Sequence, residues 1–121
     1  MATYVLIVDD EPSIAMSLEF IMEKQGYETQ VVGDGAEALQ RIEKAPPDVV
    51  LLDVMLPTYD GFEVCRRIRE REEWADLKVL MVTAKGREED VKRGLALGAN
   101  GYVTKPFAIK DVVAKVEGLL T

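Results

Sequence analysis

The chain of 121 residues contains no histidine, and Cys65 is its only cysteine. Without histidine it cannot build an imidazole metal site, a serine–histidine hydrolase site or a phosphohistidine of its own. A single cysteine excludes an internal disulfide and a thiolate metal cluster, in agreement with a reducing compartment. We interpret Cys65 as a small buried hydrophobic residue. Any chemistry must therefore use carboxylates, lysines or hydroxyls.

Excess positive charge and long apolar segments are also missing. The net charge of −7 argues against a nucleic-acid-binding surface, which needs clustered lysine and arginine. No apolar run approaches the roughly 20 residues of a membrane helix, and the first residues show no signal-peptide pattern. We therefore expect a cytoplasmic protein that binds neither nucleic acid nor membrane. Its length and its 48% apolar composition predict one domain, residues 1–121.

The most informative stretch is 48–57, DVVLLDVMLP. Four apolar residues, 49–52, lead directly into Asp53, and Pro57 stops the pattern soon afterwards. An uninterrupted short apolar run is typical of a strand buried on both faces, as in a parallel sheet. Asp53 would then emerge at the edge of the sheet, where it could equally be an ordinary turn residue.

Similar strand patterns alternate with helical ones along the whole chain. Alternation of this kind predicts a doubly wound α/β fold with five parallel strands, for which 2-1-3-4-5 is a common order. The predicted strands are 4–8, 28–32, 49–52, 77–82 and 101–104, and the predicted helices are 12–25, 36–44, 61–71, 88–97 and 109–120. Trp74 falls in the loop after the third helix. The last helix shows an apolar stripe with helical spacing, formed by Ile109, Val112, Val113, Val116, Leu119 and Leu120.

Polar residues follow four of these strands. Asp9 and Asp10 follow the first strand, Asp53 the third, Thr83 the fourth and Lys105 the fifth. In an open α/β sheet, ligands bind at the carboxyl ends of the strands where the strand order reverses, so these groups should gather at one edge. Taken separately, the acids or Thr83 could cap helices and Lys105 could be an exposed cation. Chance alone would rarely place polar residues after all four strands.

Charge balance indicates what such a site needs. Two carboxylates about 4 Å apart at an effective dielectric constant of about 20 repel each other by roughly 4 kcal/mol. One lysine cannot offset three acids, and oxygen ligands favour Mg²⁺ or Mn²⁺ over Zn²⁺. A carboxylate beside a metal and a lysine is a candidate nucleophile towards phosphorus.

These residues resemble the receiver domains of bacterial two-component response regulators, a flavodoxin-like family that includes the chemotaxis regulator. The matching motifs are Asp9-Asp10-Glu11-Pro12, Asp53 with Leu56-Pro57 and Asp60-Gly61, Thr83-Ala84, and the segment 102–107, YVTKPF. The resemblance implies a phosphorylation-activated switch in which Asp53 accepts a phosphoryl group. The donor would be an external histidine kinase, a phosphotransfer protein or a small acyl phosphate.

The resemblance also implies roles for the other motif residues. Asp10, Asp53 and the backbone carbonyl of Met55 would bind Mg²⁺ directly, and Asp9 would act through water. Lys105, Thr83 and Ala84 would contact the phosphoryl group, with a cis bond before Pro106. Thr83 and Tyr102 would form the switch and would alter the surface of the fourth helix, fifth strand and fifth helix, which controls an output domain or partner protein.

Some positions depart from related DNA-binding regulators. Asn100-Gly101 and Lys115 stand where those regulators commonly have two acids and an arginine, so the dimer of that class is in doubt. A monomer and a phosphorylation-dependent dimer both stay open. The receiver could act alone or belong to a longer regulator.

Two other classes of protein are alternatives to a receiver. An aspartate-dependent phosphohydrolase would need an acid where Met55 stands. A flavodoxin-like electron carrier binds a phosphate, which the acids after the first strand would repel.

Overall fold

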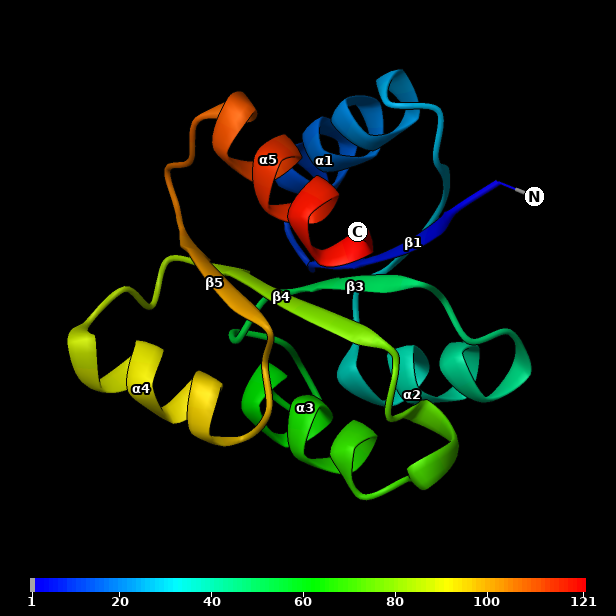
Figure 1. Cartoon of the computed structure of the whole chain (residues 1–121). Coiled ribbons are helices and arrows are strands. Elements are labelled where there is room, and N and C mark those ends of the chain that lie inside the picture. Colours follow the sequence, from blue (N-terminus) through cyan, green and yellow to red (C-terminus); the bar gives the residue numbers. More distant parts are fainter. Residues whose placement is uncertain (1) are drawn as a thin grey trace.

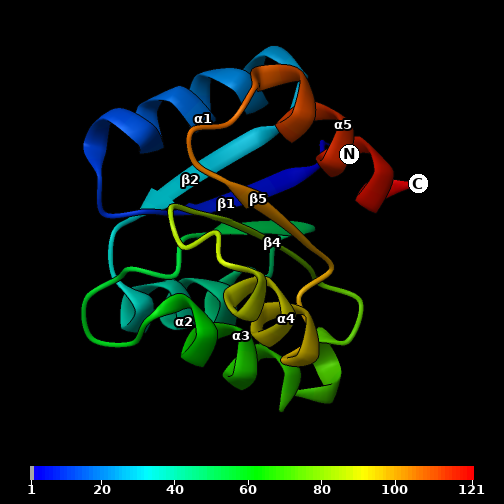
Figure 2. The same ribbon diagram turned by 90° about the vertical axis from the view of Figure 1, so that its left-hand side faces the viewer.

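The computed structural model describes residues 2–121, which fold into three layers (Figure 1). A parallel sheet in the order β2-β1-β3-β4-β5 forms the middle layer, which confirms the predicted doubly wound fold. Figure 2 shows α1 and α5 on one face and α2, α3 and α4 on the other. The strands are β1 (Tyr4–Val8), β2 (Glu28–Val32), β3 (Val49–Leu52), β4 (Lys78–Thr83) and β5 (Gly101–Thr104), and the helices are α1 (Pro12–Lys24), α2 (Gly35–Lys44), α3 (Gly61–Arg69), α4 (Glu88–Ala96) and α5 (Ile109–Leu120).

Strand β3 is the centre of the hydrophobic core. Each of its four residues is at most 1% exposed, as the uninterrupted apolar run predicted. Because side chains alternate along a strand, Val50 and Leu52 pack among the residues of α2 and α3, while Val49 and Leu51 face α1 and α5. Two separate cores thus hold the strand rigidly from both faces.

The end of α3 differs from the prediction. The helix stops at Arg69 instead of continuing to residue 71, and a short 3-10 turn, η1 (Glu72–Trp74), follows it. Trp74, which we expected in a loop, is only 5% exposed, and the Arg71 guanidinium lies 4.2 Å from the centre of its ring. Burial of this large side chain draws the chain inwards, and helical spacing in the sequence does not reveal such a tertiary effect.

Helix α5 packs on the sheet by only part of its predicted apolar stripe. Val112 and Val116 are fully buried, whereas Ile109 is 63% exposed, so its expected place in the stripe is wrong. Ile109 is the first residue of the helix, whereas the buried Val112 and Val116 lie about one and two turns further along it. Over residues 2–121, no helix combines the length and the apolar character needed to cross a membrane.

The Cys65 thiol allows a simple check of this packing. Its side chain is fully buried, and burial raises the pKa of the thiol. We expect no reaction with a disulfide reagent such as DTNB in native buffer at pH 8, and complete reaction in guanidinium chloride. Rapid reaction of the native protein would contradict the described position of α3.

Candidate functional site

Three polar residues continue the strand ladder beyond the ends of the strands. The Asp9 amide donates to the last carbonyl of β2 at 3.0 Å, and the Asp53 amide donates to the last carbonyl of β1 at 3.0 Å. The Lys105 amide likewise donates to the last carbonyl of β4 at 2.9 Å. The sheet itself therefore fixes the backbone from which each functional side chain extends.

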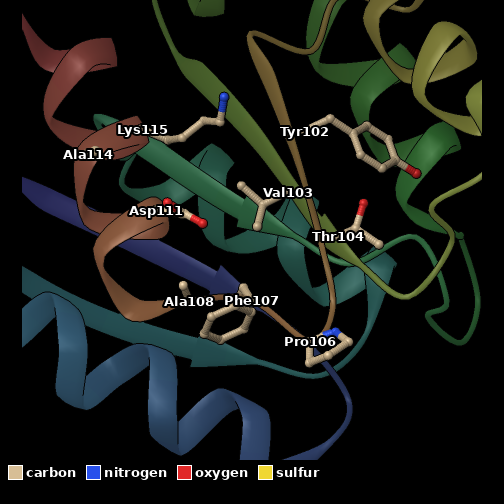
Figure 3. Close-up of a pocket in the computed structure, with 9 residues that line it drawn as sticks. All are labelled: Tyr102, Val103, Thr104, Pro106, Phe107, Ala108, Asp111, Ala114 and Lys115. Carbon is tan, nitrogen blue, oxygen red and sulfur yellow. The ribbon is translucent and has the colours of Figure 1, made fainter.

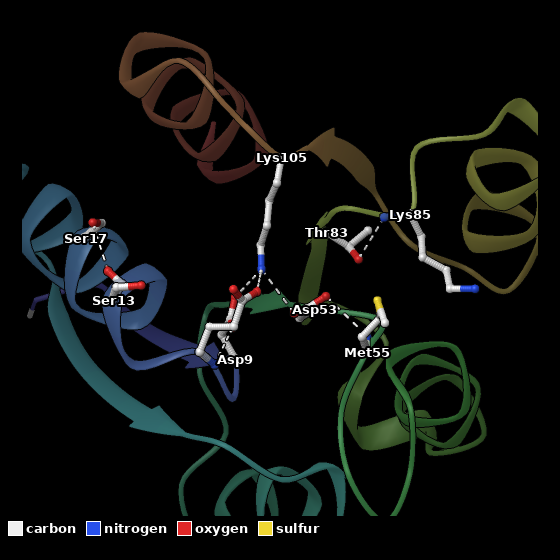
Figure 4. A network of polar contacts seen from close by, with 9 residues as sticks. Asp9, Ser13, Ser17, Asp53, Met55, Thr83, Lys85 and Lys105 are labelled. Atoms are coloured by element: carbon white, nitrogen blue, oxygen red, sulfur yellow. Dashed lines mark hydrogen bonds and ion pairs between the residues drawn. The ribbon is translucent and has the colours of Figure 1, made fainter.

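The Lys105 ammonium lies at the centre of the site (Figure 4). Its nitrogen donates to Asp9 Oδ2 at 2.9 Å, Glu11 Oε1 at 3.0 Å and Asp53 Oδ2 at 3.1 Å. Asp9 and Asp53 are each 3% exposed, and the Lys105 side chain is 9% exposed. Lys105 is therefore a buried ion-pair partner, and the alternative of an exposed loop cation is wrong.

Burial and ion pairing act on this cluster in opposite directions. Burial alone would lower the pKa of Lys105, but its hydrogen bonds to Asp9, Glu11 and Asp53 outweigh that effect and raise the pKa above its ordinary value. For Asp9, burial dominates and raises the pKa, although the Glu11 amide and Lys105 favour the charged form. The lysine is thus held firmly in its charged state.

Three carboxylates form one acidic pocket. Asp9, Asp10 and Asp53 each offer an oxygen, and these oxygens all lie within 4.8 Å of one another. Lys105 supplies one positive charge against these three acids, so the pocket keeps an excess of negative charge. Clustered carboxylate oxygens of this kind match the ligand preference of a hard divalent cation such as Mg²⁺.

The helix-capping alternatives do not explain these residues. Glu11 is the N-cap of α1 and its side chain caps nothing, although Asp9 Oδ1 accepts from the Glu11 amide at 2.9 Å. Helix α4 begins after Arg87, and Thr83 is not its cap. Thr83 is instead fully buried, and its hydroxyl accepts from the Lys85 amide at 3.3 Å.

Tyr102 contacts the same loop as Thr83. Its hydroxyl donates to the Lys85 carbonyl at 2.5 Å, and its ring lies against Gly94 of α4, where an added Cβ would come within 3.0 Å of the ring. Burial, with smaller contributions from Asp90 and Asp53, raises the pKa of Tyr102 to about 12. The two residues predicted to form the switch thus meet at Lys85.

Met55 lies beside the acidic pocket. Asp53, Met55 and Lys85 line an open hollow, and the Met55 amide donates to Asp53 Oδ1 at 3.2 Å. The Met55 side chain is 57% exposed. The peptide bond between Lys105 and Pro106 is cis.

Two residues near the pocket were not given a role by the sequence. Glu11 pairs with Lys105, and its place directly after two acids could have suggested this. Gly61 packs so closely on Asp53 that an added Cβ would collide with the Asp53 carbonyl oxygen. No local sequence signal reveals that second contact, because it depends on how α3 packs against the end of β3.

A doubly wound α/β domain with an acidic pocket and a buried lysine at the ends of its strands has the arrangement of a signalling receiver. The family model described as "Response regulator receiver domain" matches residues 5–117. The chain therefore belongs to the response regulator receiver domain family, in the CheY-like form used in two-component signalling. Membership places it among signalling modules and sets aside the hydrolase and electron-carrier alternatives.

Solved structures agree with this assignment. A protein assigned as a response regulator of Chloroflexus aurantiacus is 38% identical with a TM-score of 0.95, and the match covers 99% of this chain and 98% of that one. The chemotaxis response regulator CheY4 of Vibrio cholerae is 32% identical with a TM-score of 0.92, covering 98% and 99% of the two chains. A BeF3-activated DrrB receiver domain is 32% identical with a TM-score of 0.89, covering 99% and 98%.

Replacing Lys105 tests the ion-pair cluster. Lys105→Met leaves the buried Asp9 and Asp53 carboxylates without their cation, so we expect a loss of about 3 kcal/mol in the free energy of unfolding at pH 7 without divalent metal. Burial raises the pKa of Asp9, and without Lys105 this carboxyl takes up a proton more readily as the pH falls, so the loss should shrink towards pH 4. Urea denaturation measures both effects. Exposed Lys110→Met is the control, and equal stability of the two variants would contradict the described cluster.

Proposed function

We propose that this receiver is a phosphorylation-activated switch whose phosphoryl acceptor is Asp53. The observation that carries the proposal is the position of the Asp53 carboxylate, which is held by β3, bonded to Lys105 at 3.1 Å and adjacent to Asp9 and Asp10. The BeF3-activated form of a similar receiver supports it, since beryllofluoride is a chemical analogue of a phosphoryl group. Receivers interact with histidine kinases, which fits an external donor for a chain without histidine.

The proposed reaction moves a phosphoryl group from nitrogen to oxygen. One Asp53 oxygen forms a bond to phosphorus while the bond from phosphorus to the donor's imidazole nitrogen breaks. The nitrogen keeps the electron pair, and the imidazole can then take up a proton. Lys105 would move from the Asp53 carboxylate to the phosphoryl oxygens, and Thr83 with Ala84 would bind the same group. A small acyl phosphate could serve as donor in the same way.

The proposed cofactor is Mg²⁺, with Mn²⁺ as an alternative. Asp10, Asp53 and the Met55 carbonyl would hold it directly, and Asp9 would do so through water. When bound, the cation supplies positive charge that offsets the carboxylates and the incoming phosphoryl oxygens. The three clustered carboxylates fit this need, because Lys105 alone leaves them with unbalanced negative charge.

The proposed switch links Asp53 to a distant surface through Thr83 and Tyr102. Both bond to Lys85, so a movement of Thr83 towards the phosphoryl group would disturb the loop that holds the Tyr102 hydroxyl. Tyr102 would then turn inwards and change the surface of α4, β5 and α5. A groove between β5 and α5 next to Tyr102 would belong to this output surface (Figure 3).

The circuit around the switch belongs to the same proposal. The donor is a cognate histidine kinase or a phosphotransfer protein, and the target is an output domain or a downstream protein. We further propose that residues 1–121 form one cytoplasmic receiver domain that does not bind nucleic acid or membrane. It would act as a monomer or as a phosphorylation-dependent dimer.

Phosphoryl transfer can be measured by intact mass spectrometry. Incubation with phosphoramidate or acetyl phosphate and Mg²⁺ should add one phosphoryl group, and Asp53→Asn should abolish the gain. Asp76→Asn, at an exposed position away from the pocket, should behave like the unaltered protein. If the Asp53→Asn variant still gains a phosphoryl group, Asp53 is not the phosphoryl acceptor.

The lifetime of the proposed aspartyl phosphate should be long. Met55 and Lys85 border the pocket, and neither carries an acid or amide that could orient an attacking water. We expect Met55→Asn to accelerate decay about fivefold, the factor that corresponds to one hydrogen bond of about 1 kcal/mol. Radiolabel loss after donor removal measures this, with exposed Met16→Asn on α1 as control. A lifetime of only seconds in the unaltered protein would count against the expectation.

A further inference from the structure

Thr58 has an unusual backbone conformation. Its φ angle is +68°, and apart from glycine it is the only residue with positive φ in the range 2–121. A β-branched residue is disfavoured in this left-handed region, where glycine or asparagine is common. Such strain persists only where surrounding contacts stabilise it, and it often marks a segment whose position matters.

A short hydrogen bond stabilises the Thr58 conformation. The Thr58 hydroxyl donates to Asp34 Oδ2 at 2.6 Å, while Asp34 Oδ1 accepts from the amides of Ala36 and Glu37 at 2.7 and 3.1 Å. Asp34 is thus the N-cap of α2 and at the same time the partner of Thr58. These bonds, that from Thr58 foremost, lower the pKa of Asp34.

The backbone reinforces this contact on either side of Thr58. The Gly35 amide donates to the Pro57 carbonyl at 3.2 Å, and a Cβ on Gly35 would collide with the Tyr59 carbonyl oxygen. Residues 57–59 are therefore pressed against the start of α2. We call the contacts of Asp34 and Gly35 with residues 57–59 the α2 clasp.

The α2 clasp lies on the segment that carries Met55. This segment leaves Asp53, turns through a bond from the Leu56 amide to the Val54 carbonyl at 3.1 Å, and then reaches the clasp. The Met55 amide donates directly to Asp53 Oδ1 at 3.2 Å. Only two residues separate Met55 from Thr58, so release of the clasp would let the Met55 backbone move relative to the Asp53 carboxylate.

We propose that Thr58 is a positioning residue for the acceptor site. Its bond to Asp34 holds residues 57–59 against α2 and so fixes the Met55 backbone beside Asp53. Through this position, the clasp sets the affinity of the pocket for Mg²⁺. The link to Mg²⁺ rests on the function proposed above, whereas the link to the Met55 backbone does not.

Two substitutions remove the bond from opposite sides. Thr58→Val keeps the shape of the side chain and loses the hydroxyl. Asp34→Ser keeps a good helix cap, but its side chain is too short to reach Thr58. Thr58→Asn favours positive φ and retains a polar group, so it is the rescue variant. The matched control is Thr29→Val on β2, which removes a hydroxyl that lies 3.5 Å from a carboxylate oxygen of Glu19 on α1.

Amide hydrogen exchange, followed by NMR, reports the clasp directly. We expect Thr58→Val and Asp34→Ser each to speed exchange of the Met55 and Gly35 amides about fivefold, the factor that corresponds to one typical hydrogen bond. The double variant should be no faster than either single variant, and amides of β3 should not change. Unchanged Met55 exchange in both single variants would overturn the proposal.

Titration with MgCl₂, followed by the same amide signals, tests the consequence for the pocket. Thr58→Val should weaken Mg²⁺ binding about fivefold, and Thr58→Asn should restore it, while Thr29→Val binds as the unaltered protein does. Faster exchange with unchanged Mg²⁺ affinity would reduce the clasp to a structural contact and overturn its role in the site. Failure of the unaltered protein to bind Mg²⁺ would instead refute the proposed function, and Met55 exchange would still decide whether the clasp holds the loop.

Discussion

The bonds from one ammonium group to three carboxylates are the interaction on which this site depends. Lys105 lies 2.9 to 3.1 Å from oxygens of Asp9, Glu11 and Asp53, in a region where Asp9 and Asp53 are almost excluded from water. Like charges at such separations repel strongly at the reduced dielectric constant of a protein. The site is therefore held together by one cation and remains short of positive charge.

The fold makes this unfavourable cluster possible. Each of the three strand-following residues Asp9, Asp53 and Lys105 is tied to the last carbonyl of a neighbouring strand, and helices cover both faces of the sheet. The two hydrophobic cores around β3 thus stabilise an arrangement that its own charges oppose. A new phosphoryl group on Asp53 would change the charge balance at Lys105, and the shared contacts of Thr83 and Tyr102 with Lys85 offer a route from that change to the surface.

Much of the fold and of the site could be predicted from the sequence, because the spacing of apolar residues indicates the helices and strands, and the polar residues directly after the strands indicate the site. The apolar run 49–52 gave the central strand, and the acids and Lys105 lay at strand ends where the doubly wound fold gathers them. Ile109 and Trp74 were misplaced because their burial depends on where a helix meets the sheet and how a chain bends after α3. The bond between Thr58 and Asp34 joins residues 24 positions apart and follows no periodic pattern, so only the structure reveals it.

The central claim is that Asp53, among several neighbouring acids, accepts the phosphoryl group. Borohydride reduces an aspartyl phosphate to homoserine, and peptide mass spectrometry can then locate the modified residue. After treatment with phosphoramidate and Mg²⁺, the account predicts homoserine at position 53 and unmodified aspartate at positions 9, 10 and 60. Homoserine at any of those other positions, with Asp53 unmodified, would contradict it.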